Sequence, residues 1–280
     1  MFLLDFILNL AALLLWLNWR TLGFARLAPS QGISIARTIR QAGPVKAKRW
    51  RSAAALAALL IVRGLLYYQI GSALGWTAYL SFGVTSLPFR SEFLGQMWLY
   101  SLFSFGRILF LFYLWLGLLA IINWRADDSN WWQRLVRLHL GGLARLPAAS
   151  WVALPVLMVA LVWTASSPLF HWLRSLPPVA SWSHTLEQGF VIGLSALLSW
   201  KYLLAGLLLL HVLASYIYFG KAPLWQFVES SARVLLSPLR RLPLILGRFD
   251  FAPLVGIALV WAGAELGGRG LAALYRRLPL

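Results

Sequence analysis

The stretch from Pro223 to Trp261 reads P-L-W-Q-F-V-E-S-S-A-R-V-L-L-S-P-L-R-R-L-P-L-I-L-G-R-F-D-F-A-P-L-V-G-I-A-L-V-W. An amphipathic segment comes first, and a basic Pro-Leu-Arg-Arg-Leu-Pro turn follows it. An Asp-Phe-Ala-Pro sequence then leads into an apolar run. This order predicts a helix that lies on a membrane surface, a bend, and a helix that enters the bilayer.

The composition of the whole chain is that of a membrane protein. Of 280 residues, 60% are hydrophobic and only 12% are charged, whereas an ordinary soluble domain is about half apolar even when Gly is counted. The net charge is +17, and sparse, mostly basic charges are typical of loops that face anionic lipid. The chain has no Cys, which excludes disulfides, thiolate metal sites, iron–sulfur clusters and cysteine nucleophiles.

Apolar runs of spanning length predict six transmembrane helices. We expect them at about residues 2–17, 53–74, 93–122, 151–170, 190–219 and 251–267. The first run has no basic n-region and no cleavage site, so we expect it to be retained as a span and not removed as a signal peptide. Segment 75–91 is predicted to be a loop or a re-entrant piece. Basic amphipathic segments within 25–51, from Trp131 and from Pro223 are predicted to form interfacial helices.

Internal similarity predicts that the chain consists of three copies of one helix-hairpin unit. Trp132-Gln133 is echoed by Trp225-Gln226, and the run Val152 to Trp163 is echoed by Phe251 to Trp261. The predicted units are a diverged N-terminal hairpin at 1–75, a second unit at 92–170 and a third at 186–268, followed by a short basic tail at 269–280. The fold class is therefore an all-α membrane bundle in which each unit carries a basic interfacial helix.

The last third of the chain resembles the C-terminal motif of the YggT (YlmG-like) family of integral membrane proteins. The matching residues are Trp225, Pro238, Arg240, Arg241, Pro243, Gly247, Asp250 and Pro253. Ala252 stands where many members of that family carry Ser. The resemblance implies a membrane protein built from two such units, so the N-terminal unit is an addition or a diverged repeat. It also implies broad roles, namely osmotic-stress tolerance, an association with division genes, or assembly functions in chloroplasts.

The distribution of basic residues predicts the orientation of the chain. Most Lys and Arg lie in the loops within units, whereas the loops between units hold only Arg90 and Arg174. By the positive-inside rule, the basic loops are cytoplasmic and both termini lie outside a bacterial inner membrane. The arginines of the tail, Arg269, Arg276 and Arg277, oppose this orientation mildly.

Three cations lie inside predicted spans, namely Arg63, Arg107 and Lys201. A cation costs about 2.5 to 3.5 kcal/mol at the centre of a span even on the lenient insertion scale. Such residues either line an anion-attracting or water-filled cavity, or they snorkel to headgroups and bond to neighbouring polar groups. We expect no carboxylate in mid-span to pair with them.

The remaining polar residues predict no catalytic residue, no cofactor and no metal site. His211 is alone in its span, which favours a neutral side chain that bonds across a helix interface over a haem or metal ligand. Asp250 precedes the sixth span and is interpreted as a helix cap. No serine has a His and an acid in a recognisable arrangement, and Gly-x-x-x-Gly patterns are not a theme.

The basic interfacial helices carry the leading hypothesis about function. Their candidate contacts with lipid or partner proteins are Arg134, Arg137, Arg145, Arg240, Arg241, Trp132 and Trp225. We expect a non-enzymatic scaffold or assembly factor that contacts anionic lipid headgroups. Other membrane proteins and a second copy of the chain are further candidate partners, and direct contact with nucleic acid is not expected. The alternative is a small ion or solute channel in which Arg63, Arg107 and Lys201 line the pathway. A membrane enzyme has little support because no general base lies within the spans.

Overall fold

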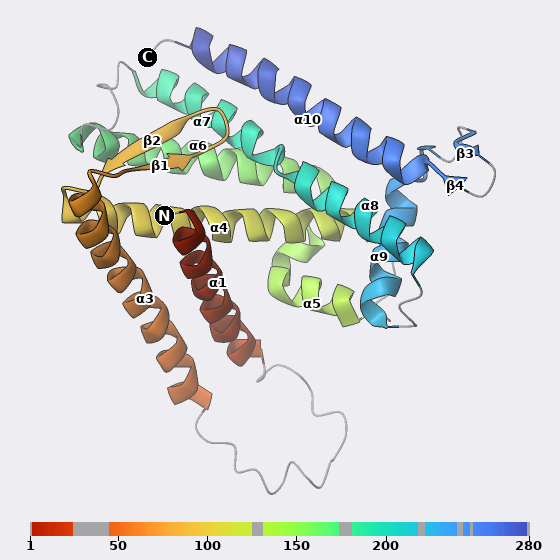
Figure 1. Ribbon diagram of the computed structural model, residues 1–280, viewed down its shortest axis with the longest axis horizontal. Helices are drawn as coiled ribbons and strands as arrows, with labels where there is room; N and C mark the ends of the chain where they lie inside the picture. Colours follow the sequence, from red (N-terminus) through yellow and green to blue (C-terminus); the bar gives the residue numbers. More distant parts are fainter. Residues whose placement is uncertain are drawn as a thin grey trace, which may run out of the picture. The chain divides into compact units, whose positions relative to one another are not determined.

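The computed structural model of the chain describes residues 2–24, 45–124, 131–173, 181–217, 222–239, 243–246 and 249–278 (Figure 1). Its six candidate spans are helices long and apolar enough to cross a membrane. They are α1 (Phe2–Phe24), α3 (Val45–Leu74), α4 (Leu94–Ile122), α6 (Ala148–Trp172), the pair α7 (Trp182–Leu197) and α8 (Trp200–Tyr216), and α10 (Ala252–Arg277). This confirms the predicted all-α membrane class with six spans. The surface helix predicted within 25–51 lies almost wholly outside the described residues.

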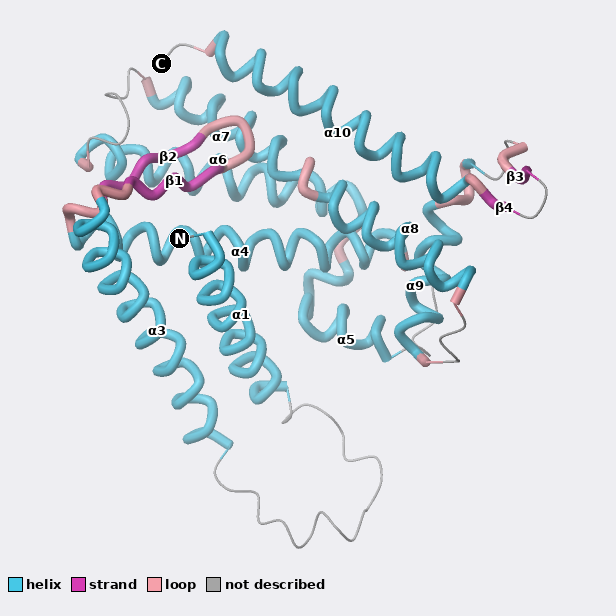
Figure 2. Tube along the Cα trace, in the orientation of Figure 1, coloured by secondary structure: helices cyan, strands magenta, loops and turns pink. Residues whose placement is uncertain are grey.

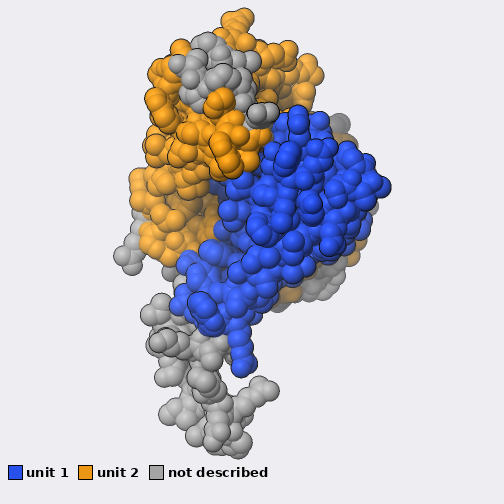
Figure 3. Space-filling model, turned by 90° about the vertical axis from the view of Figure 1, so that its left-hand side faces the viewer, with its two compact units in different colours: residues 1–80, 88–110 blue, residues 81–87, 111–280 orange. Residues whose placement is uncertain are grey.

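The chain forms two compact units, which Figure 3 shows in different colours. The first comprises residues 1–80 and 88–110, and the second comprises residues 81–87 and 111–280. Helix α4 passes from one compact unit into the other after residue 110. The boundary between the compact units therefore lies inside the predicted second repeat, 92–170, and not between two predicted repeats. The threefold repeat therefore stays a prediction.

The first unit is built around the antiparallel pair α1 and α3. Ala12 on α1, Leu56 on α3 and Phe105 on α4 form its buried apolar centre. Nearer the C-terminal end of α1 and the N-terminal end of α3, Asn18 Nδ2 donates a hydrogen bond to Ser52 Oγ over 3.2 Å. Gly75 ends α3 with a positive φ of 60°, a backbone conformation that favours glycine.

Segment 75–91 forms a β-hairpin, which the sequence did not predict. Strands β1 (Thr77–Ser81) and β2 (Ser86–Arg90) pair with each other, as Figure 2 shows. Phe82 N donates to Thr85 O over 2.8 Å, and Gly83 takes a positive φ of 82° in the turn. The buried residues alternate along both strands, and this period of two is the strand signal that a reading of the segment as a plain loop misses.

Within the second unit, α6 and α7 pack unusually closely. A Cβ atom added at Gly189 would lie 2.8 Å from Ala160 Cα, and one added at Gly193 would lie 2.8 Å from Val156 O. These glycines form a Gly-x-x-x-Gly pattern, the arrangement that lets helix backbones approach in membranes. The expectation that Gly-x-x-x-Gly patterns are not a theme overlooked this one.

The fifth span begins earlier than predicted, at Trp182 and not at Phe190. Ser181 provides the start signal, because its side chain accepts a hydrogen bond from Ser183 N over 3.2 Å. The helix tightens between α7 and α8, where Leu198 N and Ser199 N donate to carbonyls three residues earlier. Such tighter turns are characteristic of short 3₁₀ stretches within a longer helix.

The sixth span also differs from its prediction, because α10 continues to Arg277 and includes most of the segment predicted as a tail. The predicted span ended at about Gly267, before Arg269. However, Glu265 Oε1 accepts a hydrogen bond from Arg269 Nε over 3.1 Å. This i,i+4 pair and the Leu- and Ala-rich sequence after it favour continuation of the helix.

Candidate functional site

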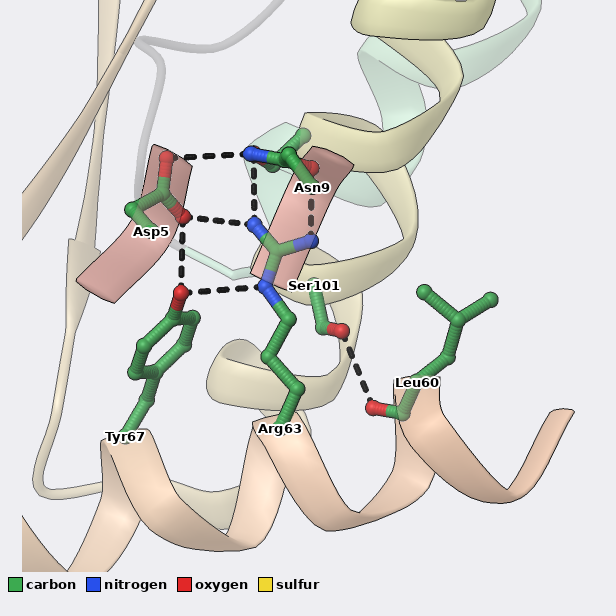
Figure 4. A network of polar contacts seen from close by, with 7 residues as sticks. Asp5, Asn9, Leu60, Arg63, Tyr67 and Ser101 are labelled. Atoms are coloured by element: carbon green, nitrogen blue, oxygen red, sulfur yellow. Dashed lines mark hydrogen bonds and ion pairs between the residues drawn. The ribbon is translucent and has the colours of Figure 1, made fainter. Parts of the chain in front are cut away.

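The most extensive polar site in a described span is centred on Arg63 of α3, which is fully buried (Figure 4). Its Nε donates to Tyr67 Oη over 3.0 Å, and its Nη1 donates to Asn9 Oδ1 over 2.7 Å. Its Nη2 donates to Asp5 Oδ1 over 2.5 Å and to Ser104 Oγ over 2.7 Å. Asp5 supplies the negative charge, so the site is an ion pair held within hydrogen-bonded neighbours.

The geometry of the site follows from helical periodicity. Asp5 and Asn9 are one turn apart on α1, and Arg63 and Tyr67 are one turn apart on α3, so each pair shares one face of its helix. Tyr67 Oη donates to Asp5 Oδ1 over 2.8 Å, and Asn9 Nδ2 donates to Ser104 Oγ over 3.1 Å. The network therefore joins α1, α3 and α4 through side chains.

Aromatic rings surround Tyr67 on the side towards the end of α3. The ring of Tyr67 lies 5.6 Å from that of Tyr100 and 5.8 Å from that of Trp76. Phe89 lies 5.7 Å from Tyr100. Such edge-on contacts are the favourable arrangement of aromatic pairs. They pack apolar surface beside the ion pair, while the Asp5 side chain keeps 25% of its surface exposed.

Asp5 is the functional residue that sequence reasoning missed. The expectation that no carboxylate pairs with the intramembrane cations is wrong for Arg63. Asp5 stands near the start of the first apolar run, and only the antiparallel packing of α1 on α3 brings it to Arg63. One sequence pattern could have revealed this site. Asp5 and Asn9 on α1, and Arg63 and Tyr67 on α3, are each four residues apart, a spacing that predicts a polar face on each helix.

The other two intramembrane cations have different surroundings. Lys201 Nζ lies 4.8 Å from the ring centre of Trp261 and 5.1 Å from that of Tyr202, and these two rings contact each other at right angles. Aromatic faces stabilise a cation where water is scarce. Arg107 on α4 is half-buried and belongs to the first unit, as Arg63 does, whereas Lys201 belongs to the second.

The interfacial helices α5 (Trp131–Leu140) and α9 (Pro223–Leu235) contact each other within the second unit. Val136 and Leu140 of α5 join a buried cluster with Leu116 of α4 and Trp151 of α6. On α9, Ala232 joins a second cluster with Leu208 of α8 and Ala252 of α10. Each helix therefore buries one apolar face at the end of a span, as predicted for interfacial helices.

A polar pair holds α9 to the end of α4. Asn123 Nδ2 donates to Ser231 Oγ over 2.9 Å, and Ser231 Oγ lies 3.2 Å from Asn123 Oδ1. Both residues are buried. Asn123 and Arg137 also line a small hollow with Val136 and Phe227. The two interfacial helices are thus fixed to the spans and to each other.

The structure places some of the predicted lipid- or partner-binding residues and not others. Arg137 and Trp225 are half-buried on α5 and α9. The backbones of Trp132 and Arg134 belong to α5 and that of Arg145 to the short 3₁₀ helix at Gly141–Arg145, but their side chains lie outside the described part. Arg240, Arg241 and the motif residue Gly247 lie outside the described residues altogether. Arg233, which was not a candidate, is exposed on α9 and pairs with Glu229 over 2.8 Å.

The motif residues that the structure describes shape the entry into α10. Asp250 Oδ1 accepts a hydrogen bond from Ala252 N, at the first residue of α10, over 2.9 Å. Its carboxylate therefore lies at the helix start as predicted, although the N-cap residue itself is Phe251. Pro253 occupies the first turn of α10, where its missing N–H costs nothing. Strands β3 (Ile245–Leu246) and β4 (Phe249–Asp250) pair just before it. Pro238 and Pro243 precede these strands in the chain, and residues 240–242 between them lie outside the described part.

The described histidines occupy separate surroundings. His139 Nδ1 lies 2.9 Å from Leu135 O on α5, and its ring packs 6.4 Å from that of Phe112. Among the described residues, no three of His, Asp and Glu are grouped as metal ligands would be. Comparison with protein-family models, with curated proteins and with solved structures finds no match to the chain.

Proposed function

We propose that this chain is a non-enzymatic membrane scaffold of the YggT family, which binds anionic lipid headgroups through α5 and α9 at the cytoplasmic surface of a bacterial inner membrane. The contact between these two amphipathic helices is the observation that carries the proposal. Each follows an apolar helix and precedes another, since α5 lies between α4 and α6, and α9 lies between α8 and α10. Helices that flank spans in this way lie at the interface, where basic side chains meet lipid phosphates.

The fixed position of α5 and α9 supports a scaffold more than a mobile segment. Their buried faces contact four apolar helices, α4, α6, α8 and α10, through the two clusters described above, and Ser231 is hydrogen-bonded to Asn123 at the end of α4. Basic side chains carried on helices that are already packed require less ordering of the backbone when they bind headgroups. The same surface is suited to a membrane partner that carries acidic residues.

The environment of Arg63 favours the scaffold over the channel alternative. A cation that lines an ion pathway must be free to meet the passing ion. The guanidinium of Arg63 instead donates to Tyr67, Asn9, Asp5 and Ser104. The Asp5 carboxylate neutralises its charge, and the four bonds together join neighbouring helices.

The proposal is tested by measuring the lipids that copurify with the protein in detergent, using native mass spectrometry. The variant carries Gln in place of Arg134, Arg137, Arg240 and Arg241. Because each basic residue near a charged surface contributes about 1 kcal/mol, we expect retention of anionic lipid to fall at least about tenfold. Insertion, checked by protease protection, should not change.

A matched control removes the same number of charges elsewhere, by Gln substitution of Arg90, Arg174, Arg276 and Arg277. These residues lie in the loops between the predicted units or at the end of the chain. The control should retain lipid at the level of the unmodified protein. Equal losses in the two variants would show that net charge, and not the α5 and α9 surface, governs binding.

A further inference from the structure

The outward face of α10 carries an uninterrupted seam of small and charged residues. Its members are Ala258, Ala262, Glu265, Arg269, Ala272 and Arg276, which follow one another at alternating steps of four and three residues. All are exposed except Ala272, which is half-buried. A seam with this average period of 3.5 residues is the pattern by which one helix packs along another.

The opposite face of α10 already packs within the second unit. Gly256 faces Leu208 of α8, and Gly267 faces Leu198 at the junction of α7 and α8. These contacts occupy positions on the other side of the helix from Glu265 and Arg269, given about 100° of rotation per residue. The seam therefore lies on the face of α10 opposite the contacts that Gly256 and Gly267 make within the second unit.

An ion pair lies within this seam. Arg269 Nε and Glu265 Oε1 are 3.1 Å apart, and the two side chains keep 75% and 58% of their surface exposed. Both residues belong to the sixth candidate span, Ala252–Arg277. A charged pair within a span is costly when it faces lipid, so it is expected to face protein.

We propose that a second copy of the chain covers this seam, with the two α10 helices packed parallel about a two-fold axis along the membrane normal. Copies that insert in the same orientation can only pack their α10 helices in parallel. Ala258 and Ala262 let the helix axes approach closely, as small residues do in membranes. The charges are self-complementary, because Glu265 of each copy lies within one turn of Arg269 of the other.

Cysteine cross-linking tests the geometry of this interface directly. The natural chain has no Cys, so each introduced thiol is the only one present. Full-length Ala258→Cys and Ala262→Cys variants, oxidised in native membranes, should form disulfide-linked dimers. The controls Leu259→Cys and Leu266→Cys lie on another face of the same helix and are also exposed, at 57% and 69%. They should form several-fold less dimer, and equal yields at all four positions, or none at any, would overturn the proposal.

A mixing experiment tests the charge complementarity. Glu265→Arg chains repel one another across the seam, as do Arg269→Glu chains, but the two variants attract each other. Fluorescence energy transfer in liposomes should therefore favour mixed pairs. We expect a preference of about threefold per cross-chain pair, and thus about tenfold for the two symmetric pairs.

The exposed pair Glu229 and Arg233 on α9 provides the matched control, because it has the same i,i+4 spacing and lies outside the spans. Mixing Glu229→Arg with Arg233→Glu chains should give no preference. If the α10 variants also show none, the seam is covered by lipid or by another protein and the proposal fails. This outcome is independent of the lipid-binding test, which concerns α5 and α9.

Discussion

Arg63 donates four side-chain hydrogen bonds within the first unit, so one substitution removes all of them. Replacing it with Leu leaves the Asp5 carboxylate without its cation and the Asn9 carbonyl oxygen without its Arg63 donor. Breaking a buried ion pair from one side costs about 3 to 5 kcal/mol. We expect Arg63→Leu to lower the free energy of unfolding by about 3 kcal/mol, measured by denaturant titration in mixed micelles.

The double variant Asp5→Leu, Arg63→Leu separates the value of the pair from the cost of a lone charge. Apolar replacement of both members leaves no unpaired charge, so the double variant should be more stable than Arg63→Leu alone. Arg277→Leu, which changes an exposed arginine at the end of α10, should be nearly neutral. Losses that add across Asp5 and Arg63 would contradict a direct coupling between them.

Among the secondary-structure elements, the contact between α6 and α7 is the most sensitive to added volume. An Ala at Gly189 would press on the Ala160 backbone, and an Ala at Gly193 would press on the Val156 carbonyl. Backbone atoms cannot rotate away, so the helices must separate. We expect each substitution to cost about 1 to 3 kcal/mol of unfolding free energy, measured in the same titration.

Gly206→Ala on α8 is the control for this prediction. Nothing lies within 4 Å of a Cβ atom added at Gly206, and Ala favours a helix over Gly by about 1 kcal/mol. The variant should therefore be neutral or slightly more stable. A neutral Gly189→Ala would show that α6 and α7 do not depend on this close approach.

These elements also show that local sequence patterns predict helices and caps but not the contacts between helices. The spans, the amphipathic α5 and α9, and the Asp250 cap depend on residues close together in the chain, and local patterns predicted them. The partners of Arg63 and Gly189 lie on other helices, with Asp5 separated from Arg63 by 58 positions. Apolar periodicity identifies a span but does not say which face meets which helix. The hairpin at β1 and β2 was missed because short strands resemble a loop beside stronger helical signals.

For the whole molecule, the even number of candidate spans predicts that both ends of the chain lie on the same side of the membrane. The basic loops within the predicted units favour a cytoplasmic position for α5 and α9, although Arg276 and Arg277 at the end of α10 oppose it. We expect a membrane-impermeant thiol reagent to label Ser86→Cys, in the hairpin between α3 and α4, in intact bacterial cells. Ser237→Cys, which follows α9, should react only after the membrane is permeabilised.

Both test positions are exposed, so a failure to react reflects the membrane and not the protein. The reversed pattern would place α5 and α9 outside the cell, away from the anionic cytoplasmic leaflet that the lipid proposal requires. The parallel α10 pair does not depend on this choice, because reversing every copy leaves the two helices parallel. Labelling therefore tests the proposed lipid surface separately from the proposed dimer.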